Sequence, residues 1–458
     1  MRGRTGLAGV PVTARRGTSA ARSRPYGRDR SGTRPRRDRC PPGTVPVARG
    51  RGDARTVTLD SVIHADPPAH PGRERRPPAS PAADLRPFAV LQAGDGVPPG
   101  TAYLSATPGS VLWGRLPGPE DPPVLRVAPG EPVVIDTVSH EGILEDQGRD
   151  PVAFMARYGI SADLVLRDAI DVARTVPHRA GDGPHVVLGP IAVTGARPGD
   201  MLAVRIEDLR PRLPYGFVSS RHGRGALPGE MPEGPGSTFV LCTAGDGPDG
   251  PVGCIGTPAG TIRFPLGFFL GVIGVVRAGR GRPSSIPPGW HGGNLDISLL
   301  TAGSTLFLPV QVPDALVYVG DPHYAQGDGE VALTAFEAPL RATLRFDLVP
   351  AGAAEHMGVL YGETDDLLIP VGLDEDLDRA MTACVRNGLD LLTSRYPLDR
   401  ATAYAYLSVA ADFAVSQVVD QVKGVHGRIR KADLAALLDS GTPATPAPVR
   451  PFPPPKAL

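Results

Sequence analysis

The sequence predicts a mainly β fold of the α+β class, with a sandwich- or barrel-like β core and two helices near the C-terminus. Proline and glycine are very abundant, at 53 and 57 of 458 residues. Helix-forming runs are scarce before residue 374, and many short stretches alternate or run apolar over the length of a strand. Together these observations favour a loop-rich β core that is followed by helices.

The chain divides by composition into four parts. Residues 1–80 carry 18 Arg against 6 Asp or Glu and show no apolar periodicity, which predicts a disordered Arg/Pro/Gly-rich extension. A nucleic-acid-binding tail or a transit peptide is the alternative, but the whole chain contains only three lysines, so the arginine bias is no nucleic-acid signature. We expect a β-rich core over 84–350, a helical part over 351–431 packed on that core, and a Pro-rich tail over 432–458.

No apolar run reaches the roughly 18 residues that a membrane span needs. No secretory apolar region follows the first charges either. The sequence therefore predicts a cytoplasmic protein with no membrane or nucleic-acid partner.

The first strands of the core are predicted from short apolar or alternating stretches at 110–114, 123–127 and 131–138. Asp136 lies at the end of the third, just before Ser139, His140 and Glu141. A carboxylate and an imidazole at a strand end are well placed for a site, although a solvated strand end is the alternative.

A helix is predicted over 150–173, with Asp150 as its N-cap and Pro151 at its first position. A strand–turn–strand unit follows over 187–209, in which Val204 and Ile206 share one face. His185 precedes this unit, and as a lone histidine it is interpreted as structural.

Residues 213–260 show little periodicity and are expected to form a long loop over the site. A buried strand at 268–276 and an alternating strand at 342–348 are predicted beyond it. Two helices complete the fold, one over 374–393 with a 3.6-residue apolar period and one capped by Asp399 and reaching about residue 414.

Polar side chains that could bind a metal gather at the two ends of residues 289–337. They flank an apolar segment of strand length at 305–312, and the surrounding glycines allow tight turns that point them inward. These side chains are His291, Asn294 and Asp296 at one end, and Asp321, His323, Asp328, Glu330 and Glu337 at the other.

Side-chain nucleophiles are disfavoured. The four cysteines, Cys40, Cys242, Cys254 and Cys384, form no CxxC pair and are interpreted as reduced and structural. All three lysines lie near the C-terminus, which argues against Cys–Glu–Lys and Ser–Ser–Lys sites, and GxSxG is absent.

The remaining candidates are His, Asp and Glu, which suit Zn²⁺ or another divalent ion. A calcium-like stabilising site or a salt-bridge cluster is the alternative, although GDGE lacks the spacing of an EF-hand loop.

Four blocks carry a resemblance to a known family. They are SHEGILEDQGRDPVAF from Ser139, GPIAVTGARPGDMLAVRIEDL from Gly189, HGGNLD from His291 and GDPHYAQGDGE from Gly320. Over about residues 133–431 the chain resembles the acetamidase/formamidase family of linear amide hydrolases. The resemblance implies a hydrolase that converts a small linear amide such as formamide or acetamide to a carboxylate and ammonia. A metal-dependent hydrolase of another C–N substrate, such as a ureido compound, and a non-catalytic small-molecule-binding protein of the same fold are the alternatives.

For that reaction we expect water activated by a divalent metal, with Zn²⁺ as the expected ion. The expected metal ligands are His291, Asp296, Asp321 and His323. The expected catalytic residues are Glu330 as general base, Glu337 as its alternate, Asp136 and Asn294. The expected substrate-binding residues are Gly292, Gly293, Gln326 and Asp328. We also expect a homo-oligomer.

Overall fold

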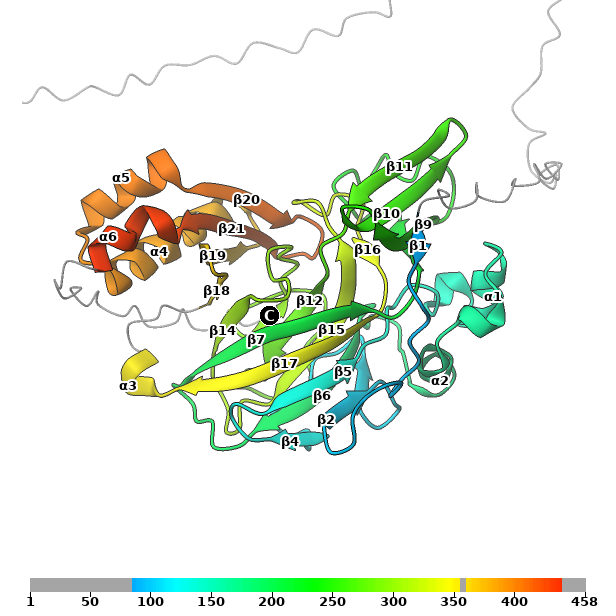
Figure 1. The fold of residues 1–458 in the computed structure, drawn as a ribbon, viewed down its shortest axis with the longest axis horizontal. Coiled ribbons are helices and arrows are strands. Elements are labelled where there is room, and N and C mark those ends of the chain that lie inside the picture. The colour runs from blue at the N-terminus through cyan, green and yellow to red at the C-terminus, as the bar shows by residue number, and fades with distance from the viewer. Residues whose placement is uncertain (1–84, 355–359, 439–458) are drawn as a thin grey trace, which may run out of the picture. The chain divides into compact units, whose positions relative to one another are not determined.

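Two large β-sheets carry the fold in the computed structural model, which describes residues 85–354 and 360–438 (Figure 1). One sheet has twelve strands and the other nine, which confirms the mainly β class and the sandwich-like core. The predicted extension over 1–80 and most of the predicted tail lie outside the described residues.

The twelve-stranded sheet runs in the order β11-β10-β9-β8-β16-β15-β12-β13, and β6 joins it beside β15. Its strand β15 therefore has β6, β12 and β16 as partners. The strands are β1 Arg86–Pro87, β3 Val111–Trp113, β4 Leu125–Val127, β6 Val186–Val193, β8 Tyr215–Ser220, β9 Thr238–Gly247, β10 Gly250–Thr257, β11 Gly260–Pro265, β12 Phe269–Val275, β13 Gly292–Asn294, β15 Val317–Ala325 and β16 Phe336–Glu337.

The nine-stranded sheet runs in the order β2-β5-β17-β7-β14-β18-β19-β21-β20. On β7 the side chains of Val204 and Ile206 are buried while Arg205 and Glu207 are exposed, as the alternation predicts. The largest apolar cluster contains buried residues of both sheets, so the two sheets share one core. The strands are β2 Ala102–Ser105, β5 Pro132–Asp136, β7 Met201–Pro211, β14 Thr305–Pro309, β17 Leu340–Val349, β18 Tyr361–Glu363, β19 Leu367–Asp374, β20 Asp412–Gln417 and β21 Lys423–Arg430.

Two helices near the C-terminus, α4 and α5, confirm the expected pair. Asp399 caps α5 by accepting hydrogen bonds from Ala401 N and Thr402 N, as predicted, whereas Asp376 caps α4. Helix α4 packs on β19 and β21 (Figure 1). The helices are α1 Pro151–Ala156, α2 Arg167–Thr175, α3 Ala351–Ala354, α4 Leu377–Arg395, α5 Arg400–Ala410 and α6 Ala435–Leu438, with short 3₁₀ turns at Glu145–Gln147, Ala162–Leu164 and Lys431–Leu434.

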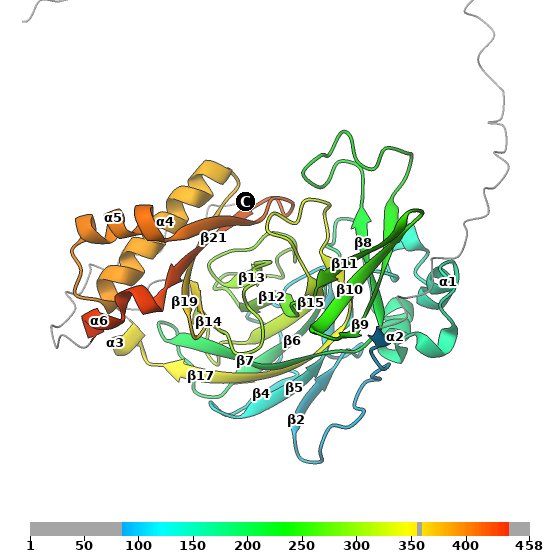
Figure 2. The same cartoon turned by 45° about the horizontal axis from the view of Figure 1, so that its top comes forward.

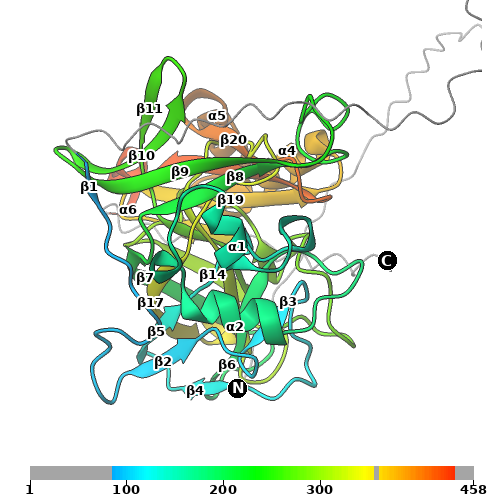
Figure 3. The ribbon, with the colours of Figure 1, turned by 90° about the vertical axis from the view of Figure 1, so that its right-hand side faces the viewer.

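The predicted continuous helix over 150–173 is wrong. Asp150 caps α1 and Pro151 opens it as expected, but the helix ends at Ala156 and Gly159 then has a positive φ of 75°. Helix α1 packs against β8, with the rings of Phe154 and Phe217 at a centroid distance of 5.2 Å (Figure 3).

The predicted long loop over 213–260 is wrong for about half of its length, which belongs to β8, β9, β10 and the start of β11, while residues 221–237 contain no helix or strand. These strands are held by cross-strand pairing with their neighbours, and their glycines and prolines hide the alternation that sequence reasoning relies on. Likewise, α5 stops at Ala410 and β20 begins at Asp412, within the stretch predicted as helix.

The C-terminal hairpin of β20 and β21, in the nine-stranded sheet, contacts the segment between β15 and β16 of the twelve-stranded sheet. A bridge joins Gly329 to Gln417, and Gly329 N donates a hydrogen bond to Ser416 O. Figure 2 shows β12, β13 and β15 between this hairpin and the strands β8 to β10. Among the described residues, no helix is both long and apolar enough to span a bilayer.

Candidate active site

Buried His, Asp and Glu side chains gather beside β15. We call this group the polar cluster; its members are His140, His185, Asp296, Asp321, His323, Glu330, Glu337 and Asp420. Within it, four overlapping groups of three residues each bring one ligand atom per residue within 4.8 Å of the others.

Strand pairing explains why these residues meet. His323 on β15 lies opposite Glu337 on β16 and opposite Phe269 on β12. Gly320 lies opposite Val187 on β6, which brings His185, just before that strand, next to Asp321. Residues that are far apart in the sequence thus converge on one short length of β15.

Asp321 and His323 lie at the centre of the polar cluster. His323 Nε2 is 2.9 Å from Glu337 Oε1 and 3.1 Å from Asp321 Oδ2. Asp321 also lies 3.4 Å from His140 Nδ1 and 3.8 Å from His185 Nε2. One carboxylate therefore faces three imidazoles.

Backbone conformation brings the carboxylates of the polar cluster inward. Asp296, Asp321 and Glu330 have φ of 50°, 53° and 46°, in the left-handed region that costs a residue other than glycine about 1–3 kcal/mol. Such conformations concentrate at functional sites. Gly271 leaves the space in front of these carboxylates open, because a Cβ there would lie 2.4 Å from Asp296 Oδ1 and 2.5 Å from Asp321 Oδ2.

The polar cluster holds five carboxylates against three imidazoles, so negative charge is in excess. Burial, followed by the charges of Glu330 and Asp420, raises the pKa of Asp296 well above its ordinary value. Burial also raises the pKa of Asp420 to about 7. Although burial opposes it, the charges of Glu337 and Asp321 raise the pKa of His323 well above its ordinary value. A divalent cation would relieve this repulsion.

Many polar atoms of the polar cluster are buried without a hydrogen-bond partner. They include both carboxylate oxygens of Asp296, Oδ1 of Asp321, both ring nitrogens of His323, Nδ1 of His140, Oε2 of Glu337 and Oδ2 of Asp420. His323 lies near two carboxylates, but not with the angles of a hydrogen bond. Buried polar groups are normally paired, so this concentration fits ligands that face a metal ion.

The structure brings together Asp296, Asp321 and His323 of the predicted ligands and both predicted bases, Glu330 and Glu337. It does not bring the fourth predicted ligand, His291, to them. The Nδ1 atom of His291 is instead 2.9 Å from the hydroxyl of Tyr318.

Asp136, predicted to be catalytic, lies in a separate buried network. Its carboxylate pairs with Arg341 at 2.6 Å, accepts a hydrogen bond from the Tyr103 hydroxyl at 2.6 Å, and lies 3.8 Å from buried Arg212. Burial opposes ionisation, but the hydrogen bond from Arg341 and the charge of Arg212 prevail and lower the pKa of Asp136. The contacts are those of a stabilising ion pair.

We therefore expect Asp136→Ala to lower the free energy of unfolding by about 3–5 kcal/mol, since it leaves the buried guanidinium of Arg341 without its carboxylate, whereas Arg212 keeps Asp168 at 2.8 Å. Because the folded pKa of Asp136 is lowered, its contribution is present above the unfolded pKa of about 3.9 and is lost as pH falls through the folded pKa. Urea denaturation at pH 7 and at acid pH measures both effects. A variant of wild-type stability that has lost activity would instead support the catalytic role.

The remaining predicted residues surround the polar cluster or lie away from it. Asn294 is buried with its Oδ1 lacking a hydrogen-bond partner, and Gln326 donates hydrogen bonds to Asp296 O and Ser416 O.

The two predicted glycines lie where a side chain would not fit well. A Cβ added to Gly292 would lie 2.3 Å from Ile273 O of β12, and a Cβ added to Gly293 would approach the His291 ring. Asp328 is exposed and pairs with Arg428. The proposed substrate contacts of these residues stay predictions.

Three members of the polar cluster are not among the predicted catalytic residues and ligands. His140 lies beside the strand end that the sequence marks as well placed for a site, but only Asp136 from that strand end is among the predicted site residues. His185 was interpreted as structural because nothing in the sequence links it to Asp321. No pattern marks Asp420, which follows β20 in a stretch with no recognisable motif.

Comparisons with known proteins identify similar sequences and one similar fold. The sequence profile of the Acetamidase/Formamidase family matches residues 275–425, which include Asp296, Asp321, His323, Glu330, Glu337 and Asp420. The crystal structure of an acetamidase from Bacillus halodurans has 27% sequence identity and a TM-score of 0.57, over 73% of this chain and 99% of that one. These matches support a place for the chain in the acetamidase/formamidase family.

Two curated relatives illustrate how far the similarity extends. The formamidase of Methylophilus methylotrophus is 29% identical over 192 residues, or 32% of this chain and 47% of that protein. The acetamidase of Mycolicibacterium smegmatis is 27% identical over 246 residues, or 42% of this chain and 59% of that protein. The chain thus spans about half the length of the curated relatives that it matches.

Proposed function

We propose that this chain is an acetamidase/formamidase that hydrolyses small linear amides to a carboxylate and ammonia, with a divalent metal ion, preferably Zn²⁺, bound in the polar cluster. The observation that carries the proposal is the set of buried imidazole and carboxylate atoms around Asp321 and His323 that have no hydrogen-bond partner. The names of the similar proteins, a formamidase and two acetamidases, support the substrate class.

The donor set supports the metal. Asp321, His323, His140 and His185 combine carboxylate oxygen with imidazole nitrogen, which suits zinc. A bound ion would polarise the amide carbonyl and lower the pKa of water.

The residues of the chain supply positioning and proton transfer. Glu330 would accept a proton from the attacking water and then deliver it to the leaving nitrogen. Burial, followed by the charges of Asp420 and Glu337, raises its pKa well above the ordinary value, which strengthens it as a base. Every member of the polar cluster is at most 8% exposed, so the site is shielded from bulk solvent.

The contacts of the described cysteines and lysines support water rather than a side chain as the nucleophile. Burial raises the pKa of the Cys242 thiol to about 12, so it stays protonated at neutral pH. Lys423 donates to Glu375 O and Lys431 pairs with Glu363, so both are engaged away from the polar cluster.

The test is ammonia release by the purified full-length protein from formamide, acetamide, propionamide, benzamide and urea, with metal content measured in parallel. We expect release from the short aliphatic amides, loss of activity on treatment with a chelator, and recovery on adding Zn²⁺. Release from urea alone would favour the ureido alternative. Binding of amides without turnover by the metal-loaded protein would favour the non-catalytic alternative.

The same preparation tests assembly. We propose a cytoplasmic homo-oligomer, and light scattering of the purified protein measures its mass.

A further inference from the structure

Glu141 is a buried carboxylate that the proposed reaction does not use. Its side chain is 1% exposed and lies directly behind His140, with 3.5 Å between His140 Nε2 and Glu141 Oε1. The other ring nitrogen of His140, Nδ1, faces Asp321 and Glu337 at 3.4 and 3.8 Å. The two nitrogens of one imidazole thus face two different surroundings.

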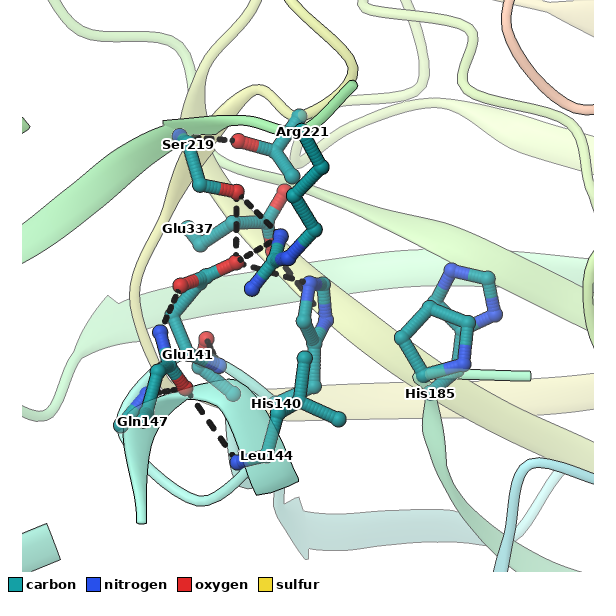
Figure 4. Close-up of polar contacts among 12 residues, drawn as sticks. His140, Glu141, Leu144, Gln147, His185, Ser219, Arg221 and Glu337 are labelled. Carbon is teal, nitrogen blue, oxygen red and sulfur yellow. Dashed lines mark hydrogen bonds and ion pairs between the residues drawn. The ribbon is translucent and has the colours of Figure 1, made fainter. Parts of the chain in front are cut away.

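Donors from separate segments hold the Glu141 carboxylate in place. Ser219 Oγ donates to Oε1 at 2.7 Å, Arg221 donates to the same oxygen at 3.0 Å, and Gln147 Nε2 donates to Oε2. Figure 4 shows the carboxylate between Gln147 on one side and Ser219 with Arg221 on the other. A carboxylate held from β8, the chain after it and the 3₁₀ turn has little freedom to follow a moving ring.

The donors are themselves fixed. Arg221 Nε pairs with Asp146 at 2.7 Å, and its guanidinium lies 5.3 Å from the centre of the Phe239 ring. Gln147 Oε1 accepts hydrogen bonds from the backbone of Gly142 and Leu144. The guanidinium of Arg221 therefore faces the Glu141 carboxylate at 3.0 Å as its ion-pair partner.

We propose that Glu141 is a positioning residue that holds the His140 ring with Nε2–H toward its own carboxylate, so that the Nδ1 lone pair faces the metal position beside Asp321 and Glu337. This inference rests on the proposed function, because it assumes that His140 binds the ion. A carboxylate behind a metal-binding histidine fixes the ring tautomer and orientation and makes the nitrogen a better ligand, and its loss typically costs about 10–100-fold in metal affinity.

The structure also allows a simpler role, in which Glu141 only anchors Arg221. Glu141→Gln separates the two roles because it keeps the size of the side chain and an oxygen acceptor for Ser219 and Arg221, but removes the negative charge that faces His140. Asp146→Asn is the matched control, because it weakens the other ion pair of Arg221 without contacting His140.

The experiment measures the zinc affinity of the metal-free full-length proteins by competition with a chromophoric chelator, together with the melting temperature. We expect Glu141→Gln to lower zinc affinity about 10–100-fold, and kcat to recover at saturating zinc, while Asp146→Asn changes the melting temperature without changing zinc affinity. Equal zinc affinity of Glu141→Gln and wild type would overturn the proposal and leave the proposed function intact.

Two further outcomes are decided by the same measurements. If Glu141→Gln does not fold, Ser219→Ala removes a single hydrogen bond to the carboxylate, and an unchanged zinc affinity in that variant overturns the proposal. A wild-type protein that takes up no divalent metal would overturn both this inference and the metal in the proposed function.

Discussion

Asp321→Asn is expected to abolish metal binding and amide hydrolysis together. Asp321 faces His323, His140 and His185 at 3.1, 3.4 and 3.8 Å and belongs to two of the four possible ligand groups. Burial opposes its ionisation, but the neighbouring His323 and His185 lower the pKa of Asp321 well below its ordinary value, so it offers a charged oxygen at neutral pH. The substitution keeps the shape and removes that charge.

Elemental analysis and ammonia release measure this effect. We expect the zinc content to fall from about one equivalent per chain or more to background. The rate of ammonia release should fall with it, by more than the roughly 10–100-fold that is typical when a residue that only supports a ligand is lost. Asp208→Asn is the control, since Asp208 pairs with Arg210 on the exposed side of β7. Full zinc content in Asp321→Asn would remove Asp321 from the ligand set.

Glu330→Gln is expected to lower kcat about 10²–10⁴-fold while the metal stays bound, the usual cost of losing a general base. Glu330 is, at 8%, the most exposed member of the polar cluster, so it is the carboxylate best placed to meet water and substrate. Glu337 is anchored more firmly, with Oε1 2.9 Å from His323 and accepting a hydrogen bond from Ala335 N.

Steady-state kinetics with metal analysis distinguishes the two carboxylates. If Glu337→Gln shows the loss of kcat with metal retained and Glu330→Gln does not, the base is Glu337. Cys242→Ala and Cys254→Ala are the matched controls. Both cysteines lie on the paired strands β9 and β10 and belong to none of the ligand groups of the polar cluster, so both variants should keep near wild-type kcat. Trapping of an acyl-enzyme by hydroxylamine would contradict attack by water.

Local signals in the sequence predicted much of the fold. Alternation identified β7 and the apolar run identified β12, while Asp399 and the 3.6-residue period identified the C-terminal helices. The strands of 213–260 could not be predicted this way, because each depends on pairing with a distant neighbour and not on its own pattern.

The site was predictable where its residues lie close together in the sequence. Asp321, His323, Glu330 and Glu337 come from one stretch that bends back on itself through β15 and β16. His185 and Asp420 could not be identified, because only the pairing of β6 with β15 and the bridge from Gly329 to Gln417 bring their segments to it. The positive φ of Asp296, Asp321 and Glu330 is likewise a property of the folded backbone.

The position of Asp420 has a consequence for shortened forms of the gene product. A premature stop after β19 leaves intact every sequence block that carries the family resemblance, from Ser139 to Glu330. It nevertheless removes Asp420 and the hairpin that bridges to Gly329. The motifs of such a truncated protein would still resemble the family, although its site would lack Asp420. An activity assigned from the motifs alone would therefore be too high.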